Sequence, residues 1–403
     1  MKSIVFIETT KTGSGHEGIK TVFRLGYAPI LVTDRRGLFE NQEEFPEVSR
    51  IIFVSEIVEE LIGIEIEILQ KEGCEIAAII SFVDPYVSLA TNLSNAFCGS
   101  NISAGALRIM ENKAITREFL EKDRMNARYE IYDAKIGVAK MRNCYPFVIK
   151  AAVSKASRDV YLVENNFEAE NVVNKLVRLY PNQEIILEEY LNGPQYLVEV
   201  VIYNGKVNIV AIIKQEIEKE VKFIVTGYMV LLNVEESMYA KIYDAVTSIQ
   251  ETLKISNAAF HIEIRIINGC VKLVELNPRI SGGAMNRMIE ESFGISLVEQ
   301  TIKIYLGLEP DLINTHEKNI YVHYITIHSY GYLLKITGID SAKKSEGVRE
   351  VFVKPIVGSI IIPPISMGHR YGYVIATGDT VSEAKRNAMQ AASKIKFYIE
   401  PLD

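Results

Sequence analysis

Four polar side chains in the middle of the chain have the types and the spacing of a site that binds metal and phosphate. Glu263 lies in one run of alternating apolar residues, and Glu275 lies in the next run. In a hairpin, two such strands allow both carboxylates to point to one face. Asn277 is two residues beyond Glu275, so strand alternation places it on the same face, and Arg279 follows after two more residues.

Oxygen ligands of this kind suit Mg²⁺, which keeps several waters and takes further ligands from phosphate. Two carboxylates that lie close together would repel each other without a cation. For either glutamate alone, a solvated hairpin edge with scattered charges is the favoured interpretation. The ordered set Glu263, Glu275, Asn277 and Arg279 favours a magnesium and phosphate site instead.

This set resembles, residue for residue, the metal motif of the ATP-grasp carboxylate-amine ligases. In that family a glutamate on one strand and an E-x-N-x-R run on the next strand bind two Mg²⁺ ions and the phosphates of ATP. The resemblance implies that Glu263, Glu275 and Asn277 bind the metal. It also implies that Glu275, Arg279 and Lys150 act in catalysis, with ATP and Mg²⁺ as the cofactors.

Other motifs occur in the order of the same family. Asn112-Lys113 opens a helix, residues 145–150 form a strand that ends at Lys150, and residues 187–193 read LEEYLNG. The resemblance implies that Lys113 and Lys150 contact phosphates, for which the flexible stem of lysine is suited. It also implies a hinge for adenine, formed by the side chain of Glu188 and the backbone of Glu189 and Leu191.

Two positions depart from the family pattern. The residue that commonly holds the ribose is a glutamate, but this chain has Gln195, so Gln195 or Glu199 is the expected ribose contact. The loop after Lys150 reads AAVSKASRD, with fewer glycines than usual for folding backbone N–H groups around phosphate. Ser157 and Arg158 are expected to supply side-chain donors instead, in a lid over residues 153–159.

Residues 330–403 resemble the terminal subdomain of the L-amino acid ligases, the dipeptide-forming branch of this family. The implied reaction is ATP- and Mg²⁺-dependent formation of an amide between an amino acid, or an amino acid conjugate, and the amine of a second amino acid. It passes through an acyl phosphate, releases ADP and phosphate, and belongs to the biosynthesis of peptide-like secondary metabolites such as antibiotics. The expected substrate contacts are Tyr228, Arg279, Gly282, Gly283 and Arg287.

The elements that must position these residues fall into three domains. Residues 1–100 alternate apolar strands with helical patterns, which is typical of a Rossmann-like parallel sheet. Residues 101–310 contain two hairpins with Asn-Gly turns, at 204–205 and 268–269, and are expected to form the ATP-grasp domains around an antiparallel sheet. Residues 311–403 form a C-terminal α+β subdomain, so the fold class is α/β and α+β.

Composition excludes several other classes of protein. The 403 residues are 48 % hydrophobic and 24 % charged, with a net charge of −7, which argues against nucleic acid as the main partner. The four cysteines form no metal-binding cluster, and no segment has the length of a membrane span or the pattern of a secretory signal. We therefore expect a cytoplasmic enzyme with small-molecule carboxylate and amine substrates; a homodimer is left open.

Three alternatives remain. Residues 13–18 read GSGHEG, which matches the letters of a dinucleotide-binding loop, but Asp34 is followed at once by two arginines. A turn shaped for a small substrate or for helix packing is favoured there over NAD(P). A purine-biosynthesis or carboxylase-type relative would share the ATP motifs, although no lysine lies in a biotin-attachment context. A non-catalytic nucleotide-binding module would be expected to lack a metal ligand, and none is missing.

Overall fold

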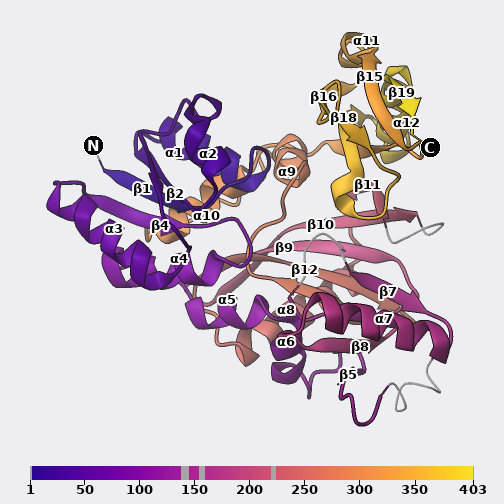
Figure 1. Ribbon diagram of the computed structural model, residues 1–403, viewed down its shortest axis with the longest axis horizontal. Helices are drawn as coiled ribbons and strands as arrows, with labels where there is room; N and C mark the ends of the chain where they lie inside the picture. The colour runs from indigo at the N-terminus through magenta and orange to yellow at the C-terminus, as the bar shows by residue number, and fades with distance from the viewer. Residues whose placement is uncertain (1, 138–144, 154–158, 219–223, 403) are drawn as a thin grey trace.

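The N-terminal lobe, drawn in indigo and violet in Figure 1, is built on a four-stranded parallel sheet. Its strands lie in the order β3-β2-β1-β4. The computed structural model describes residues 2–137, 145–153, 159–218 and 224–402. Side chains of β1 alternate between two buried clusters: Ile4 and Phe6 face α1, whereas Val5 and Ile7 face α3 and α4. Because both faces are covered, the strand is apolar throughout. The elements of this lobe are β1 (Ser3–Ile7), α1 (Ser14–Arg24), β2 (Ala28–Thr33), α2 (Arg36–Glu40), β3 (Arg50–Phe53), α3 (Glu59–Lys71), β4 (Ile76–Ile80) and α4 (Val87–Cys98).

A segment from much later in the chain completes this lobe. Helix α10 (Leu297–Tyr305) packs against α1, and it follows α9 (Met285–Phe293). The Tyr305 hydroxyl lies 2.7 Å from the Thr91 hydroxyl of α4, and the Ser100 hydroxyl donates to the Tyr305 carbonyl at 2.7 Å. The N-terminal lobe therefore contains residues from both sides of the predicted boundary at residue 100.

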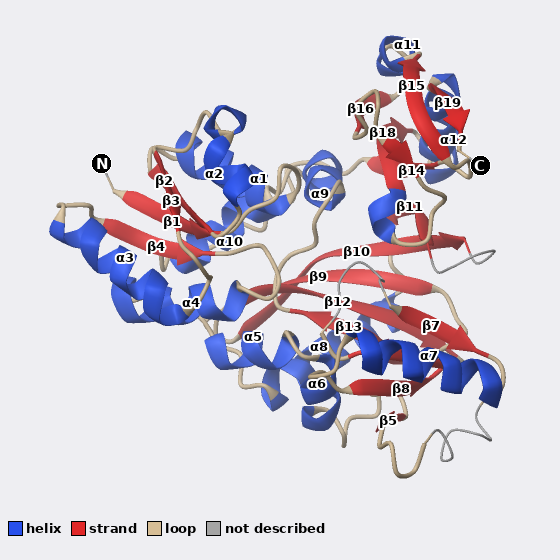
Figure 2. Cartoon of the chain, in the orientation of Figure 1, coloured by secondary structure: helices blue, strands red, loops and turns tan. Residues whose placement is uncertain are grey.

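An eight-stranded antiparallel sheet forms the centre of the molecule, in the order β13-β12-β9-β10-β11-β14-β18-β16 (Figure 2). Both predicted hairpin turns are confirmed. Asn204-Gly205 and Asn268-Gly269 have φ between 49° and 75°, as a two-residue turn between right-twisted strands requires. Helix α8 (Glu236–Thr252) packs on this sheet. The strands are β9 (Gln195–Tyr203), β10 (Lys206–Glu218), β11 (Ile224–Val230), β12 (Ala258–Ile267), β13 (Cys270–Asn277), β14 (Asn319–Thr326), β16 (Val348–Val353) and β18 (Arg370–Gly378).

A smaller antiparallel sheet, β5-β8-β6-β7, meets the large sheet near β13. Helix α7 packs on this small sheet through Ala169, Val173 and Leu176. Helix α6 connects the two sheets, because Arg117 donates to the Leu273 and Val274 carbonyls of β13. The elements are α5 (Ala104–Met110), α6 (Lys113–Phe119), β5 (Tyr129–Ile131), β6 (Phe147–Ala151), β7 (Val160–Val163), α7 (Asn166–Leu179) and β8 (Ile185–Glu189).

The C-terminal segment extends the central sheet. β14 pairs with β11, so β14, β18 and β16 continue the sheet that contains the β12-β13 hairpin. A separate three-stranded sheet, β17-β15-β19, covers the far end of this lobe. Its strands are β15 (Gly331–Thr337), β17 (Ile360–Ile361) and β19 (Lys396–Pro401), and the helices are α11 (Ile339–Lys343) and α12 (Val381–Lys394). The predicted fold class, a parallel N-terminal sheet followed by antiparallel α+β structure, is confirmed.

No helix in the described ranges is both long enough and apolar enough to cross a membrane.

Candidate active site

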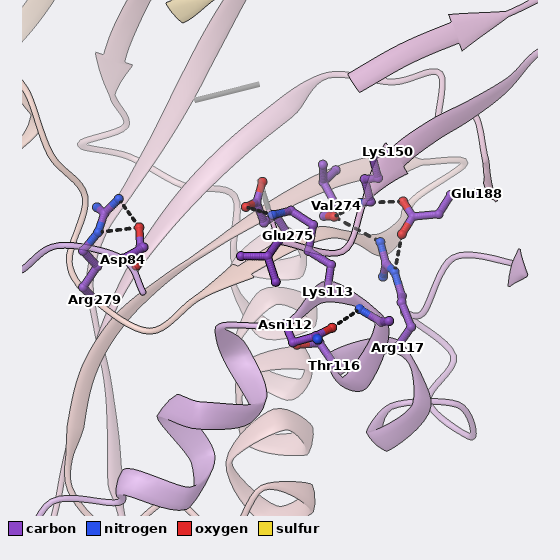
Figure 3. Close-up of polar contacts among 12 residues, drawn as sticks. Asp84, Asn112, Lys113, Thr116, Arg117, Lys150, Glu188, Val274, Glu275 and Arg279 are labelled. Atoms are coloured by element: carbon purple, nitrogen blue, oxygen red, sulfur yellow. Dashed lines mark hydrogen bonds and ion pairs between the residues drawn. The ribbon is translucent and has the colours of Figure 1, made fainter. Parts of the chain in front are cut away.

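The two glutamates of the predicted metal motif lie directly opposite each other. In the β12-β13 hairpin Glu263 pairs with Glu275, and His261 pairs with Asn277. Burial raises the pKa of Glu263 to about 7, and the negative charge of Glu275 adds to the effect. The Lys113 ammonium lies 3.2 Å from Glu275 Oε1 (Figure 3). The pair therefore has the electrostatics of a site that binds a cation or a proton.

A bulge in β13 produces this arrangement. Glu263 pairs with Glu275 and Ile264 pairs with Leu273, so Val274 has no partner on β12. The carbonyl of Val274 instead accepts hydrogen bonds from Arg117 at 3.0 Å and from Lys150 at 3.4 Å. Bulges re-aim side chains next to functional sites. Here the bulge turns Glu275 towards Glu263 and gives two cations a backbone acceptor.

Helix α6 positions Lys113. The Asn112 side chain caps the helix by accepting from the backbone N–H groups of Ala114 and Ile115 at 2.9 and 3.2 Å. The backbone N–H of Lys113 donates to the Ala152 carbonyl at the end of β6, at 3.1 Å. Lys113 is thereby fixed at the junction of the small sheet with the β12-β13 hairpin.

Lys150, Glu188 and Arg117 form a buried charge cluster. Lys150 Nζ lies 2.7 Å from one Glu188 oxygen, and Arg117 Nε donates to the other oxygen at 2.8 Å (Figure 3). All three side chains are at most 7 % exposed. Burial alone would raise the pKa of Glu188. The positive charges and hydrogen bonds of Arg117 and Lys150 outweigh burial and lower the pKa of Glu188 to about 2. Both Glu188 oxygens are thus already engaged within the protein.

The hinge residues Glu189 and Leu191 also have protein partners. The Glu189 carboxylate accepts from the backbone and the guanidinium of Arg128 at 2.9 and 3.2 Å. The Glu189 backbone N–H donates to the Arg128 carbonyl, and Arg265 donates to the Leu191 carbonyl. The segment is therefore held between β5 and β12.

The two predicted ribose contacts lie apart on β9. Gln195 donates to Glu263 at 2.7 Å and to Gln215 at 3.0 Å, and it accepts from Arg265 at 2.9 Å. Glu199 is fully buried and accepts from the Ser281 backbone N–H at 3.1 Å. Gln195 therefore belongs with the metal motif, whereas Glu199 supports the loop that follows Arg279.

Burial raises the pKa of Glu199 to about 7, because only the Ser281 N–H and the distant charge of Arg279 oppose it. The folded state therefore holds this proton more tightly than the unfolded chain does. Its stability contribution is complete below pH 4.5 and is lost as pH rises through 7. We predict that Glu199→Gln gains about 3 kcal/mol of unfolding free energy relative to the unaltered protein between pH 4.5 and 8. Urea unfolding at both pH values checks this, with exposed Glu236→Gln as the control that shows no such trend.

Arg279 is held by the N-terminal lobe. Its Nε and Nη2 atoms donate to Asp84 Oδ2 at 3.0 and 2.7 Å, and this pair lies apart from the Lys113–Glu275 and Lys150–Glu188 pairs (Figure 3). The Arg279 carbonyl lies 2.7 Å from Nδ1 of His261, whose pKa burial lowers to about 4. The neutral imidazole therefore fixes the strand end, and Arg279 connects the metal hairpin to the parallel sheet.

The remaining predicted substrate contacts do not all line one cavity. Gly283 and Arg287 line a cavity of about 360 Å³ together with Gly13 and Tyr373. Arg287 forms ion pairs with Glu290 and Glu291 at 2.9 and 2.7 Å. Gly282 lies beside the Arg279 guanidinium, and Tyr228 is buried on β11. Ser157 and Arg158, with most of the predicted lid, lie outside the described residues.

The glycine motif at residues 13–18 serves helix packing. A Cβ at Gly18 would lie 2.8 Å from the ring of Phe82 and 3.0 Å from that of Phe6. Ser14, the first residue of α1, donates its hydroxyl to the Ser281 carbonyl at 2.8 Å, so the loop at 281–283 packs against the start of this helix. This supports the packing interpretation over the dinucleotide one.

Sequence reasoning assigned no role to Arg117 or to Asp84. Arg117 lies one helical turn beyond Lys113, and that i, i+4 spacing on one helix face is a signal for a shared site. Asp84 follows shortly after β4, at the edge of a parallel sheet where ligands and partner groups commonly gather.

Two family descriptions match the chain: "ATP-grasp domain" over residues 143–287 and "L-amino acid ligase C-terminal domain 2" over residues 323–400. The chain is 24 % identical over 99 % of its length to the uncharacterized protein y4rH of Sinorhizobium fredii, covering 84 % of that protein. It is 23 % identical to the L-arginine-specific L-amino acid ligase of Bacillus subtilis, over 51 % of each chain. It is also 23 % identical to dapdiamide A synthase of Enterobacter agglomerans, over 40 % of this chain and 39 % of that one. The matches to the two named enzymes thus span about half of their length or less.

Solved structures resemble the whole fold. The L-amino acid ligase from Bacillus licheniformis superposes with a TM-score of 0.84 at 18 % identity, covering 99 % of both chains. N5-carboxyaminoimidazole ribonucleotide synthetase from Thermotoga maritima superposes at 0.72 and 19 % identity, covering 99 % of this chain and 100 % of that one. Apart from y4rH, which has no named activity, these relatives and neighbours are ligases, a synthase and a synthetase, in agreement with the predicted ligase class. The chain therefore contains an ATP-grasp domain followed by the C-terminal domain of the L-amino acid ligases, and the resemblance seen in its sequence is confirmed.

Proposed function

We propose that this protein is an ATP-dependent ligase that joins the carboxylate of an amino acid, or of an amino acid conjugate, to the amine of a second amino acid. The observation that carries the proposal is the Glu263–Glu275 pair with Lys113 beside it, on the hairpin that faces Lys150. The C-terminal domain match supports amino acids as the substrate class. We also propose that it is a cytoplasmic enzyme. A role in peptide-like metabolite biosynthesis is supported by the name of one relative, dapdiamide A synthase.

ATP would lie between the small sheet and the β12-β13 hairpin. Lys113 and Lys150 approach this junction from the end of α6 and from β6, and both are suited to bind phosphate oxygens. Because the single carboxylate of Glu188 is shared by Lys150 and Arg117, it balances only one of the two cations, and the cluster keeps a net positive charge. In this proposal Glu188 fixes the lysine, and the backbone of residues 189–191 recognises the adenine ring.

The residues fit Mg²⁺ that arrives with ATP. Within the described part of the chain, no group of three or more His, Cys, Asp and Glu side chains is arranged to hold a metal ion. Two carboxylates and the Asn277 amide provide few ligands, so phosphate and water must supply the rest, as is common for Mg²⁺. When bound, the ion would neutralise charge on the transferring phosphoryl group. Glu263, Glu275 and Asn277 would hold it.

The protein's own groups would then align the substrates. A carboxylate at this junction attacks the γ-phosphate to give an acyl phosphate, and the amine of the second substrate displaces phosphate. Arg279, held by Asp84, would fix the loop at 281–283 that follows it to the N-terminal lobe, at one edge of the proposed site. Because water would hydrolyse the acyl phosphate, the site must exclude it.

A screen for phosphate release over all pairs of the twenty amino acids, with mass identification of products, tests the proposal. We expect ADP, phosphate and a dipeptide to form in equal amounts from at least one pair. Phosphate release that requires bicarbonate and yields no amide would contradict the proposal, and would favour a carboxylating activity like that of the purine-pathway neighbour.

Ligand-induced stabilisation separates this proposal from a dinucleotide enzyme. We predict that ATP with Mg²⁺ at 100 times its dissociation constant stabilises the protein by about 2.7 kcal/mol. NAD and NADP should not, because Gly18 of the glycine motif is explained by its close packing against the rings of Phe82 and Phe6. Thermal denaturation with each nucleotide provides the measurement. Stabilisation by a dinucleotide alone would be the opposite result.

A further inference from the structure

Arg370, at the start of β18, presents a cation to the active-site face, and the described part of the chain gives it no carboxylate partner. Its Nη1 donates to the Val225 carbonyl at 3.4 Å and to the Tyr228 hydroxyl at 3.5 Å, and its Nε donates to the Met367 carbonyl at 3.3 Å. These distances exceed the usual 2.9 to 3.0 Å of N–H···O bonds. Among the described residues, no Asp or Glu forms an ion pair with Arg370.

The other cations near the site are engaged. Arg279 is bound to Asp84, and Arg287 is bound to Glu290 and Glu291. Lys113 lies beside Glu275, and Lys150 lies beside Glu188. A partly buried guanidinium that lacks such a partner retains its capacity for a bidentate bond to a carboxylate. Arg370 therefore differs from every predicted substrate-binding arginine.

Aromatic rings fix the direction of the Arg370 side chain. Its guanidinium lies 3.7 Å from the ring centre of Tyr324 and 5.9 Å from that of Tyr228. Stacking of this kind holds the guanidinium plane while leaving its edge free to donate. The Tyr324 hydroxyl accepts from the Ala284 backbone N–H at 3.4 Å, which places the stack beside the loop at 281–284.

Arg370 and the metal motif share one face of the central sheet. Tyr228 pairs with Gln215, Gln215 pairs with Gln195, and Gln195 donates to Glu263. Neighbouring strands are about 4.8 Å apart, so β12 and β11 are separated by roughly 14 Å. A molecule whose reacting end lies over Glu263 therefore extends across β9 and β10 towards Arg370.

We propose that Arg370 binds the α-carboxylate of the amine substrate, so that this ligase requires an acceptor with a free carboxylate. The inference rests on the proposed function. The acyl phosphate forms at the metal end of the face, and the attacking amine must lie next to it. The acyl phosphate and the acceptor, in series, extend along the face from the metal end. The acceptor carboxylate, two bonds from the attacking amine, is then at the end nearer the guanidinium.

The test compares each amino acid acceptor with its C-terminal amide. In the unaltered protein, the acid should be used with a KM roughly 10- to 100-fold lower than the amide, as expected for a charged hydrogen bond. Arg370→Gln should raise the KM of the acid by the same factor, leaving the KM of ATP, the KM of the donor and the KM of the amide unchanged. Arg370→Lys should retain part of the preference, and Arg386→Gln on the exposed face of α12 should retain all of it.

Two results would overturn the inference. One is equal use of acids and amides by the unaltered protein, and the other is a rise in the KM of the donor or of ATP when Arg370 is replaced. A binding assay separates this failure from failure of the proposed function. Thermal stabilisation by the free amino acids, relative to their amides, needs no turnover and should be lost in Arg370→Gln. Suppose that no pair of amino acids is ligated, but that free amino acids stabilise the unaltered protein more than their amides do and that Arg370→Gln abolishes this difference. The ligase proposal then fails, and Arg370 is still a carboxylate-binding residue.

Discussion

Glu275→Gln is expected to abolish ATP turnover while the protein remains folded. The carboxylate contacts Lys113 and faces Glu263 at the proposed metal and phosphate site, and the amide keeps its shape but removes its charge. Loss of a metal carboxylate should cost about 4 kcal/mol of transition-state stabilisation, or about 1,000-fold in kcat. Phosphate release with a productive substrate pair measures the effect.

Folding should survive this change because two effects oppose each other. The variant loses the Lys113 ion pair, but it also removes the negative charge that raises the pKa of Glu263. Circular dichroism and thermal unfolding should match those of the unaltered protein closely. Glu236→Gln, an exposed position on α8, is the matched control and should keep full activity. Near-normal turnover by Glu275→Gln would defeat the assignment of this residue.

Glu188→Gln is expected to destabilise the protein by about 3 to 5 kcal/mol, because it leaves buried Lys150 and Arg117 without their shared counter-charge. Urea unfolding provides the measurement. Glu189→Gln is the control: the exposed Arg128 is its partner, so its effect should stay below about 1 kcal/mol. Unchanged stability with weakened ATP binding would instead support a direct contact of Glu188 with adenine.

The same cluster determines how stability depends on acid. Because the folded state lowers the pKa of Glu188 to about 2, its contribution is present above the usual glutamate pKa and is lost as pH falls from 4.5 towards 2. In Glu188→Gln, the free energy of unfolding should not show this loss of stability between pH 4.5 and 2, which acid unfolding measures.

The local elements of the fold were predictable from sequence. The Asn-Gly turns at 204–205 and 268–269 require backbone angles that these residues adopt readily, and the hairpins followed from them. The apolar runs of the first 100 residues indicated strands buried on both faces. The packing of α10 against the N-terminal lobe could not be predicted in this way, because helical periodicity does not specify which surface a helix packs against.

The strand register at the metal motif is a second feature that could not be predicted from the sequence. A regular two-residue turn at 268–269 would pair Glu263 with Val274 and direct Glu275 to the opposite face. The bulge at Val274 places Glu275 on the same face as Glu263. No residue pattern in the hairpin predicted this bulge. The partners of the predicted residues could not be read from the sequence either. Asp84, which binds Arg279, and Arg370, which donates to Tyr228, come from segments distant from these residues in the chain.

Binding of Mn²⁺ in the presence of a non-hydrolysable ATP analogue, followed by electron paramagnetic resonance, tests the central claim most directly. Mn²⁺ accepts the same oxygen ligands as Mg²⁺. The account predicts that the unaltered protein binds Mn²⁺ together with the analogue, and that Glu275→Gln weakens this binding while Glu236→Gln does not. Equal Mn²⁺ binding by all three proteins would contradict the assignment of Glu263, Glu275 and Asn277 as the metal site.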